Sequence, residues 1–391
     1  MSVGNKLAIC ALSGSLLFTA GCAVNPVTGE NELSLVSAQQ EVTLGSQQYL
    51  PTQQSQGGQY YLDPELTYYV NTVGKELAAK SGRPDLPYEF VVLNNSTPNA
   101  WALPGGKIAV NRGLLLELED EAELAAVLGH EITHAAARHS AQQMSQQMLM
   151  GVGLAALQVA TDDTQYGNLI LGSAGLGAQM IQGKYGRDAE RESDYYGMRA
   201  MAAVGYDPQG AVELQETFVK LSKGRDQDWV SGLFSTHPPS QERVDANKKT
   251  AQALPSGGAR NESVYNRRIA KIRHDKPAYD AYDKGMAALA KKDSKQALKL
   301  AERAISLQKQ ESQFHELRGA ALEAQGLQQN ALKAYDKAIA LNSQYYSHYL
   351  SRGLLRKELG DSAGAKKDLE ASNRLLPTSA AQSNLGELAG H

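Results

Sequence analysis

His130-Glu131-Ile132-Thr133-His134 lies at the centre of a segment that has the pattern of an amphipathic helix. Residues four apart lie on one face of a helix, so both imidazoles can reach the same metal ion. Glu131 lies about 100° around the helix from His130, close enough to contact a metal-bound water without being a ligand. Two imidazoles, one carboxylate and an open water position suit zinc, which activates the water and polarises the scissile carbonyl. The alternative is an ordinary helix with two unrelated histidines.

The helix that carries this motif has a clear beginning. Asp120 and Glu123 have the spacing of an N-cap residue and its capping-box partner. An apolar stripe follows at helical spacing, and it consists of Leu124, Val127, Leu128 and Ile132. We therefore predict a helix from Asp120 to about His139.

A third metal ligand is expected further along the chain. Glu190 and Asp194 are four residues apart, which places two carboxylates on one helix face. One of them can bind the ion, and the other can accept a hydrogen bond from a ligating histidine. The alternative is a solvated, charge-paired helix face, and this alternative is strongest for the neighbouring Asp188 and Glu192.

The chain around the motif is predicted to be α+β and mainly helical. Apolar residues at helical spacing predict a helix over residues 64–79, whereas residues 88–93 and 107–110 have the composition of short strands. The turn Pro104-Gly105-Gly106 precedes the second strand. We expect a zincin-type metallopeptidase domain with a small sheet over residues 59–253.

Residues 148–183 have an unusual composition. Two runs rich in Gly, Ala and Met, 148–160 and 169–181, flank a short polar segment. Each run has 13 residues, whereas a helix needs about 20 to span a bilayer. The expectation is a buried or mobile helical hairpin, and the alternative is a flap that contacts the membrane or the substrate.

The N-terminus has the features of a targeting segment. Lys6 precedes an apolar stretch, residues 7–18, and the small residues Thr19-Ala20-Gly21 then precede Cys22. This pattern predicts a lipoprotein signal peptide over residues 1–21 with lipidation of Cys22, although Thr19 replaces the usual Leu. The alternative is an ordinary cleaved secretory signal.

The residues that follow bear on location. Cys10 and Cys22 are the two cysteines of the chain, so the processed protein has no internal disulfide. Ala23 stands where an Asp would resemble an inner-membrane retention signal, which favours a periplasmic protein anchored by lipid to the outer membrane. Residues 22–58 are predicted to form a tether with one helix, residues 37–50.

The C-terminal third has an internal repeat. Gly285, Gly319 and Gly353 are 34 residues apart, and two further sets of residues keep the same period. These sets are Ala297, Ala331 and Ala365, and Leu307, Leu341 and Leu375. The pattern predicts tetratricopeptide repeats over residues 276–391, preceded by a linker, residues 254–275. Such an array offers a concave surface to a protein partner.

At this point four segments resemble metallopeptidase family 48 of the gluzincins. They are Asn99-Ala100-Trp101-Ala102-Leu103-Pro104-Gly105-Gly106, His130 to His139, Glu190 to Asp194, and Thr236-His237-Pro238-Pro239-Ser240 with Arg243. The resemblance covers roughly residues 25–250, and the order of parts resembles the repeat-bearing periplasmic type. It implies that Glu190 is the third ligand and that Asp194 supports a ligating histidine. Ser193 stands where the family has Ala.

The resemblance also implies roles for residues outside the ligand set. His237 is either a fourth, displaceable zinc ligand or a donor to the transition state, and the alternative is a histidine fixed in a Pro-rich turn. His139 and Arg243 are expected behind the ligands. Asn99, Ala100, Trp101 and Ala102 are expected to present a strand edge to an extended substrate, the alternative being an ordinary core strand.

Two functions remain open from the sequence. The first is a zinc-dependent endopeptidase of the bacterial envelope that degrades misfolded or misassembled outer-membrane or periplasmic proteins, with Glu131 as general base. The second is a chaperone or assembly adaptor with a structural or regulatory metal, although Glu131 has no purpose in a purely structural site. The formal net charge of -3 gives no indication of a nucleic-acid partner.

Overall fold

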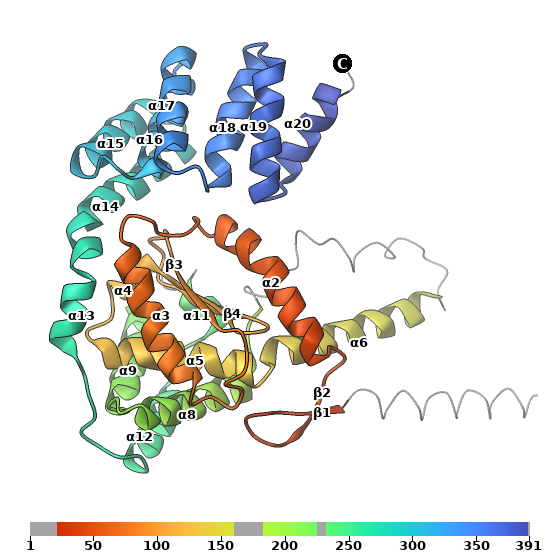
Figure 1. Cartoon of the computed structure of the whole chain (residues 1–391), viewed down its shortest axis with the longest axis vertical. Helices are drawn as coiled ribbons and strands as arrows, with labels where there is room; N and C mark the ends of the chain where they lie inside the picture. Colours follow the sequence, from red (N-terminus) through yellow and green to blue (C-terminus); the bar gives the residue numbers. More distant parts are fainter. Residues whose placement is uncertain (1–21, 160–182, 225–231, 390–391) are drawn as a thin grey trace, which may run out of the picture.

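The computed structural model describes residues 22–159, 183–224 and 232–389, and they form a mainly helical molecule with two small sheets. A part that contains the sheets is followed by a curved row of helices (Figure 1). The predicted fold class, a mainly helical α+β domain followed by helical repeats, is confirmed.

A three-stranded sheet lies at the centre of the first part. It consists of β3 (Glu89–Leu93), β4 (Ala100–Leu103) and β5 (Lys107–Asn111) in the order β3-β5-β4. β3 runs parallel to β5, and β4 runs antiparallel to it with Ala102 opposite Ile108. The glycines of the β4–β5 turn, Gly105 and Gly106, have φ of 74° and 80°, a backbone conformation that favours glycine.

Both faces of this sheet are covered, because successive side chains point to opposite faces. Phe90, Val92 and Ile108 belong to the main core with α3 (Pro64–Ala78) and α5 (Glu121–Ala136). On the other face a smaller cluster is covered by Leu44 and Tyr49 of α2 (Ala38–Ser55) and by Met144 of α6 (His139–Val159), and its members are Val91, Leu93, Trp101, Leu103 and Ala109.

Residues 22–58 are more ordered than the expected tether. β1 (Cys22–Val24) pairs with β2 (Asn31–Leu33), and α2 begins after its N-cap Ser37 as predicted but continues past Leu50 to Ser55. The reason is tertiary packing that sequence periodicity does not show. Glu41 of α2 is buried and pairs with Arg83 and Arg138. The tether prediction is therefore corrected to a segment that packs on the sheet.

The zinc-motif helix ends earlier than predicted. Asp120 caps α5 by accepting from the N–H of Glu123, at 3.0 Å, whereas the Glu123 carboxylate accepts from the N–H of Glu119 instead of closing the capping box. The helix stops at Ala136, because Arg138 adopts a left-handed backbone conformation with φ of 67°. A separate helix, α6, then starts at His139.

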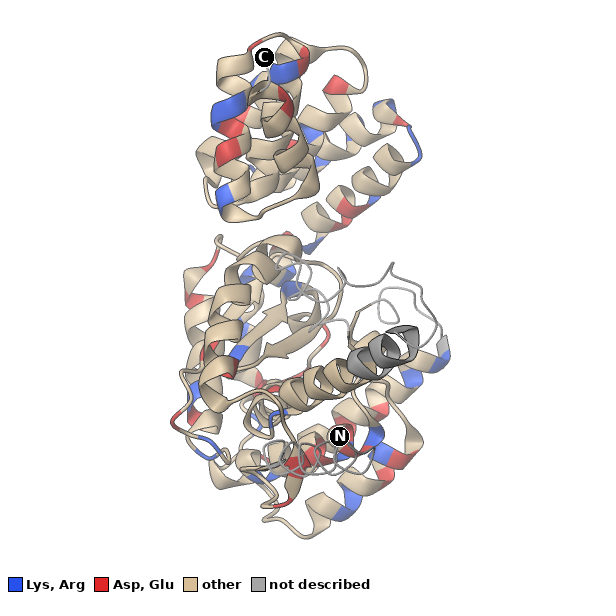
Figure 2. Cartoon of the chain, turned by 90° about the vertical axis from the view of Figure 1, so that its right-hand side faces the viewer, with Lys and Arg blue, Asp and Glu red and all other residues tan. Residues whose placement is uncertain are grey.

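Helix α6 carries no Lys, Arg, Asp or Glu between His139 and Val159. Charged residues lie instead on other helices of the molecule (Figure 2). The predicted hairpin over 148–183 falls partly on this helix, and its remainder, 160–182, lies outside the described residues. Among residues 22–159, 183–224 and 232–389, no helix has both the length and the apolar character needed to cross a bilayer.

Four further helices complete the first part around α5. They are α8 (Arg187–Ala203), α9 (Gln209–Gly224), α11 (Leu233–Thr236) and α12 (Gln241–Gln252). α5 and α8 approach so closely that a Cβ added to Gly197 would lie 2.9 Å from the carbonyl carbon of Gly129 and 3.0 Å from the backbone nitrogen of His130. This contact fixes the carboxylates of α8 against the zinc motif.

The repeats form pairs of antiparallel helices, as the 34-residue period predicts. The pairs are α14 (Ala270–Ala290) with α15 (Ser294–Leu307), α16 (Ser312–Glu323) with α17 (Gln328–Leu341), and α18 (Tyr346–Glu358) with α19 (Ser362–Leu375), closed by α20 (Ser379–Ala389). A Cβ on Gly319 would lie 2.5 Å from the ring of Tyr335, so the periodic glycines allow close helix contact.

The predicted linker, 254–275, is largely helical. It contains α13 (Glu262–Arg268) and the first residues of α14, and its buried Tyr265, Ile269 and Ile272 join the core of the first part. The Pro- and Gly-containing segment that suggested a linker ends before α13. The boundary predicted at residue 276 therefore falls inside a helix.

The repeats contact the sheet-containing part through buried polar groups. Asn94, which follows β3, donates to Glu311 at 3.0 Å, and the hydroxyl of Tyr279 donates to the same carboxylate at 2.6 Å. The guanidinium of Arg112 in the short helix α4 (Arg112–Leu115) lies 3.4 Å from the centre of the Tyr279 ring. All four side chains are buried, so the two parts have a defined interface.

Candidate metal centre

Four side chains from three parts of the chain converge at the centre of the first domain. His130 and His134 come from α5, Glu190 from α8, and His237 follows α11. Nε2 of His130 lies 3.0 Å from Nε2 of His134 and 3.2 Å from Nδ1 of His237, which in turn lies 2.9 Å from Oε1 of Glu190. One ligand atom from each of the four lies within 4.8 Å of all the others.

The protonation of this group suits a cation. Burial holds the pKa of His134 well below its usual range, so its imidazole is neutral and has a free lone pair. Burial alone would raise the pKa of Glu190, but His237, His130 and Arg243 hold it well below its usual range, so the carboxylate is ionised. Neutral imidazole nitrogens and a carboxylate oxygen are the donor set that zinc prefers, and these residues fit a zinc ion.

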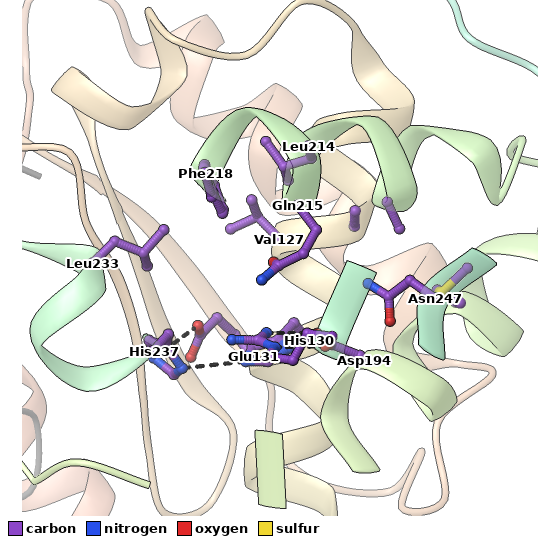
Figure 3. Close-up of a pocket in the computed structure, with 14 residues that line it drawn as sticks. Val127, His130, Glu131, Asp194, Leu214, Gln215, Phe218, Leu233, His237 and Asn247 are labelled. Atoms are coloured by element: carbon purple, nitrogen blue, oxygen red, sulfur yellow. Dashed lines mark hydrogen bonds and ion pairs between the residues drawn. The ribbon is translucent and has the colours of Figure 1, made fainter. Parts of the chain in front are cut away.

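Glu131 lies beside the ligands. Its side chain is buried, one carboxylate oxygen lies 3.5 Å from Nε2 of His237, and the other has no hydrogen-bond partner among the described residues (Figure 3). Burial raises the pKa of Glu131, which makes it a better proton acceptor than a solvated carboxylate. The residue therefore has the position and the basicity required of a general base.

Asp194 and Arg243 contact the candidate ligands. Asp194 accepts from Nδ1 of His130 at 2.9 Å, which directs the lone pair of Nε2 towards the centre of the site. Arg243 forms a two-point contact with Asp194, with both distances 2.7 Å, and its Nη1 lies 2.7 Å from Glu190. Despite burial, the charge of Arg243 holds the pKa of Asp194 below its usual range.

His139 and Tyr185 support His134 from behind. Nδ1 of His139 lies 2.9 Å from Nδ1 of His134, and the ring of Tyr185 stacks on His134 with 3.9 Å between ring centres. The hydroxyl of Tyr185 is 3.0 Å from that of Ser140, which fixes the stacked ring. Sequence reasoning missed Tyr185, because no spacing relates it to the zinc motif.

The predicted substrate residues lie on an edge strand rather than at the metal ligands. Ala100, Trp101 and Ala102 belong to β4, whose side chains are buried and whose one neighbour in the described sheet is β5. The carbonyl of Asn99 accepts from the N–H of Asn111 and continues this pairing. β4 contacts α5, and its Ala100 and Ala102 share a core with that helix.

A small cavity opens beside the site. It has a volume of about 50 Å³. Its apolar walls come from α5, α8, α9 and α11, and they include Val127, Met198, Leu214, Phe218 and Leu233 (Figure 3). His130, Glu131 and His237 line its inner end, and Gln215 also lines it. Sequence reasoning did not identify Leu214, Gln215 or Phe218 as site residues.

The two-histidine helix, the carboxylate on a second helix and the adjacent base define the class of a metallopeptidase. Residues 64–251 match the family described as peptidase family M48. This domain of the chain therefore belongs to peptidase family M48, as the resemblance of its motifs implied.

Curated relatives of this domain are peptidases. The chain is 29% identical over 254 residues to the beta-barrel assembly-enhancing protease of Escherichia coli K12, a match that covers 63% of this chain and 51% of that protein. It is 34% identical over 198 residues to the mitochondrial metalloendopeptidase OMA1 of Schizosaccharomyces pombe, covering 50% of this chain and 56% of that protein. The chain thus spans about half the length of these relatives. Among solved structures, the Arabidopsis OM64 TPR domain is 25% identical and covers 30% of this chain and 98% of its own, with a TM-score of 0.29.

Proposed function

We propose that the chain is a zinc-dependent endopeptidase of the bacterial cell envelope. The observation that carries this proposal is the convergence of His130, His134 and Glu190 beside the buried, partly unpaired carboxylate of Glu131. A closed structural site needs no such base. An endopeptidase needs one, because the nucleophilic water must lose a proton as it attacks.

The chemistry follows from the positions of the side chains. When bound, zinc supplies Lewis-acid polarisation and lowers the pKa of water. Glu131 accepts the proton of the attacking water and passes it to the nitrogen of the leaving amine. Asp194 holds His130 in the tautomer that presents Nε2 to the ion, and Arg243 keeps the carboxylates of Asp194 and Glu190 in place.

His237 is proposed to restrain the resting enzyme. Its Nδ1 lies 3.2 Å from Nε2 of His130 and 2.9 Å from Glu190, so it is within reach of the same ion as the other three ligands. A fourth ligand at the open position blocks water. We infer that His237 is displaced from the open position when substrate enters. The alternative is that His237 donates a hydrogen bond to the developing oxyanion.

The substrate is proposed to bind along the β4 edge as an extended chain. An unpaired strand edge offers main-chain hydrogen bonds that do not depend on sequence. This mode suits unfolded polypeptides, and we propose misfolded or misassembled outer-membrane or periplasmic proteins as substrates. The Escherichia coli relative, the beta-barrel assembly-enhancing protease, is named for β-barrel assembly, which supports this choice.

The remaining parts of the chain concern location and partners. We propose that lipidation of Cys22 anchors the protein, with the outer membrane as the expected site, and that the repeats recruit a protein partner or substrate. The residue sequence Thr19-Ala20-Gly21-Cys22 supports the first proposal. The regular stack of α14 to α19 supports the second, because such arrays present a continuous concave surface.

A Glu131→Gln variant tests the proposed function. It should keep its zinc, because residue 131 is not a ligand, but its hydrolysis of an unfolded protein such as casein should fall by about 10²–10⁴-fold. Zinc content and proteolysis are measured side by side, with the exposed Glu76→Gln as a matched control. Equal proteolysis by wild type and Glu131→Gln would refute the proposal that the chain is an endopeptidase.

The chaperone or adaptor alternative is favoured by one observation, the presence of His237 as a potential fourth ligand. Four protein ligands are typical of structural zinc sites. If that alternative holds, Glu131→Gln prevents aggregation of an unfolded client as well as wild type does, and neither protein cleaves it.

A further inference from the structure

Apart from the charged and imidazole side chains of the site, the cavity beside Glu131 has apolar walls and two buried amides, Gln215 and Asn247. Gln215 lies on α9 between Leu214 and Phe218, and its amide reaches from that helix towards His130 and Glu131 (Figure 3). The apolar residues suit a site that receives a substrate side chain. They give no reason for the presence of a buried amide in that site.

The amide nitrogen of Gln215 has no hydrogen-bond partner in the part of the chain that the structure describes. The side chain is 95% buried, since 5% of its surface is exposed, and Nε2 has no hydrogen-bond partner among the described residues. A buried, unsatisfied polar group destabilises a fold. An apolar residue of equal size would fit the walls without this destabilisation, so the amide suits a partner that comes from outside the chain.

The position of the cavity indicates which substrate residue enters it. This step rests on the proposed function, in which Glu131 passes a proton to the nitrogen of the leaving amine. That nitrogen must lie within hydrogen-bond distance of Glu131. Glu131 lines the inner end of the cavity, so the cavity receives the side chain of the residue that follows the scissile bond.

We propose that Gln215 is a specificity-determining residue that selects an uncharged, hydrogen-bonding side chain at the position after the scissile bond. The apolar walls contact the body of that side chain, and the amide of Gln215, which offers both a donor and an acceptor, pairs with its polar end. The cavity of about 50 Å³ favours small and medium side chains such as Thr and Asn. When a hydrocarbon side chain of equal size binds, it excludes water from the amide of Gln215 and offers it no hydrogen bond.

Isosteric peptide pairs test this selection. Two pairs of fluorogenic peptides differ at this one position, Thr against Val and Asn against Leu, and kcat/KM is measured for each. The wild-type enzyme should prefer the polar member by about 5–100-fold, the range expected when a buried polar group is left unpaired. A ratio of one, or a preference for Val and Leu, overturns the proposal without any variant.

Variants at residue 215 identify the side chain responsible. Gln215→Met keeps the length and removes the amide, so the preference should reverse towards Val and Leu, while zinc content is retained and thermal stability is equal or higher. Gln209→Met, an exposed position on the same helix, is the matched control and should leave the ratio unchanged. An equal loss of kcat/KM for both members of each pair would assign Gln215 to the substrate main chain and overturn the proposal.

A binding measurement separates this proposal from the proposed function. The Thr and Val peptides are titrated against zinc-loaded Glu131→Gln and against the double variant with Gln215→Met, with fluorescence anisotropy as the readout. Tighter binding of the Thr peptide to the single variant, lost in the double variant, supports the pocket even if wild type cleaves nothing. Equal binding of both peptides to both proteins overturns it.

Discussion

At the scale of single residues, the site depends on ion pairs between Arg243 and two carboxylates. This guanidinium contacts both Asp194 and Glu190, so a buried cation offsets part of the charge of one buried and one mostly buried carboxylate. Buried charges are tolerated when they are paired in this way. The arrangement separates the two proposed roles, ligation by Glu190 and orientation of His130 by Asp194.

Variants of these two carboxylates should therefore differ in degree. Glu190→Ala removes a ligand and should abolish both zinc binding and proteolysis. Asp194→Asn leaves the three ligands and should weaken zinc affinity by about 10–100-fold. Competition with a chelator of known affinity measures both effects. Stoichiometric, tightly held zinc in Glu190→Ala would show that another residue is the third ligand.

The pKa of Glu123 gives a dependence of stability on pH. Burial raises this pKa to about 7 from an ordinary value of 4.5. Between these values the folded state retains a proton that the unfolded state has released, so stability falls as pH rises from 4.5 to about 7. Glu123→Gln removes the titration, and its amide oxygen can still accept from the N–H of Glu119. The variant should be more stable than wild type by about 1–3 kcal/mol at pH 8 and equal to it near pH 4.5.

Thermal unfolding of wild type and Glu123→Gln at the same series of pH values checks this expectation. The comparison at each pH cancels the effect of zinc release in acid, because both proteins carry the same ligands. The exposed Glu76→Gln should show no such trend. A constant difference between Glu123→Gln and wild type across the pH range would contradict the raised pKa.

Single residues also show where prediction from sequence ends. The spacing of Glu190 and Asp194 sufficed to nominate both, because four residues make one helical face. No sequence spacing related Tyr185 or Gln215 to the zinc motif, since each contacts the site from a different part of the chain. Their roles depend on how α8 and α9 pack, and local sequence patterns do not predict that packing.

At the scale of elements, the contact between α5 and α8 sets the geometry of the site. Gly129 and Gly197 let the two helix backbones touch, and this contact aligns Glu190 with the histidines. Gly197→Ala would place a methyl group 2.9 Å from backbone atoms that cannot rotate away. The helices must then separate by a few tenths of an ångström.

Gly197→Ala should lower stability by about 1–3 kcal/mol and weaken zinc binding, although residue 197 is not a ligand. Gly386→Ala, in the terminal helix α20 where a Cβ meets no atom within 4 Å, is the matched control. Calorimetric unfolding and zinc titration measure the two effects. If Gly197→Ala binds zinc as tightly as wild type does, the close contact is not what positions Glu190.

Elements were predicted well where their signals are local. The helix at Pro64, the strands at Glu89 and Lys107, and the start of α5 at Asp120 agree with apolar periodicity and capping residues. The break at Arg138 was not predicted, because its left-handed backbone is stabilised by distant partners. Its guanidinium contacts Glu41 and the carbonyl of Val36.

At the scale of the whole molecule, the repeats and the peptidase domain are joined by a buried polar interface. Glu311 accepts from both Asn94 and Tyr279, and it is fully buried. Its loss leaves these two buried donors, and the N–H of Gln313 in the first turn of α16, without their acceptor. The sequence period predicted the array itself, but it could not predict this docking, because Asn94 and Glu311 are ordinary polar residues 217 positions apart.

Glu311→Ala should therefore destabilise the interface by about 2–4 kcal/mol and leave zinc binding intact. Limited proteolysis should then cut between the peptidase domain and the repeats, whereas Glu302→Ala, at an exposed position on α15, should resemble wild type. Zinc content is measured in parallel. Unchanged resistance to proteolysis would show that Glu311 does not hold the two parts together.

The spread of the ligands along the chain has a consequence for biogenesis. His237 follows His130 by 107 residues, and Glu190 lies between them. A polypeptide that emerges from its N-terminus first therefore exposes the histidine pair long before the remaining ligands exist. Such a nascent chain has no complete hydrolytic centre, so it can neither cleave itself nor its neighbours. The three proposed ligands and Glu131 are together only once Glu190 has been delivered, and His237, the proposed restraint, follows 47 residues later.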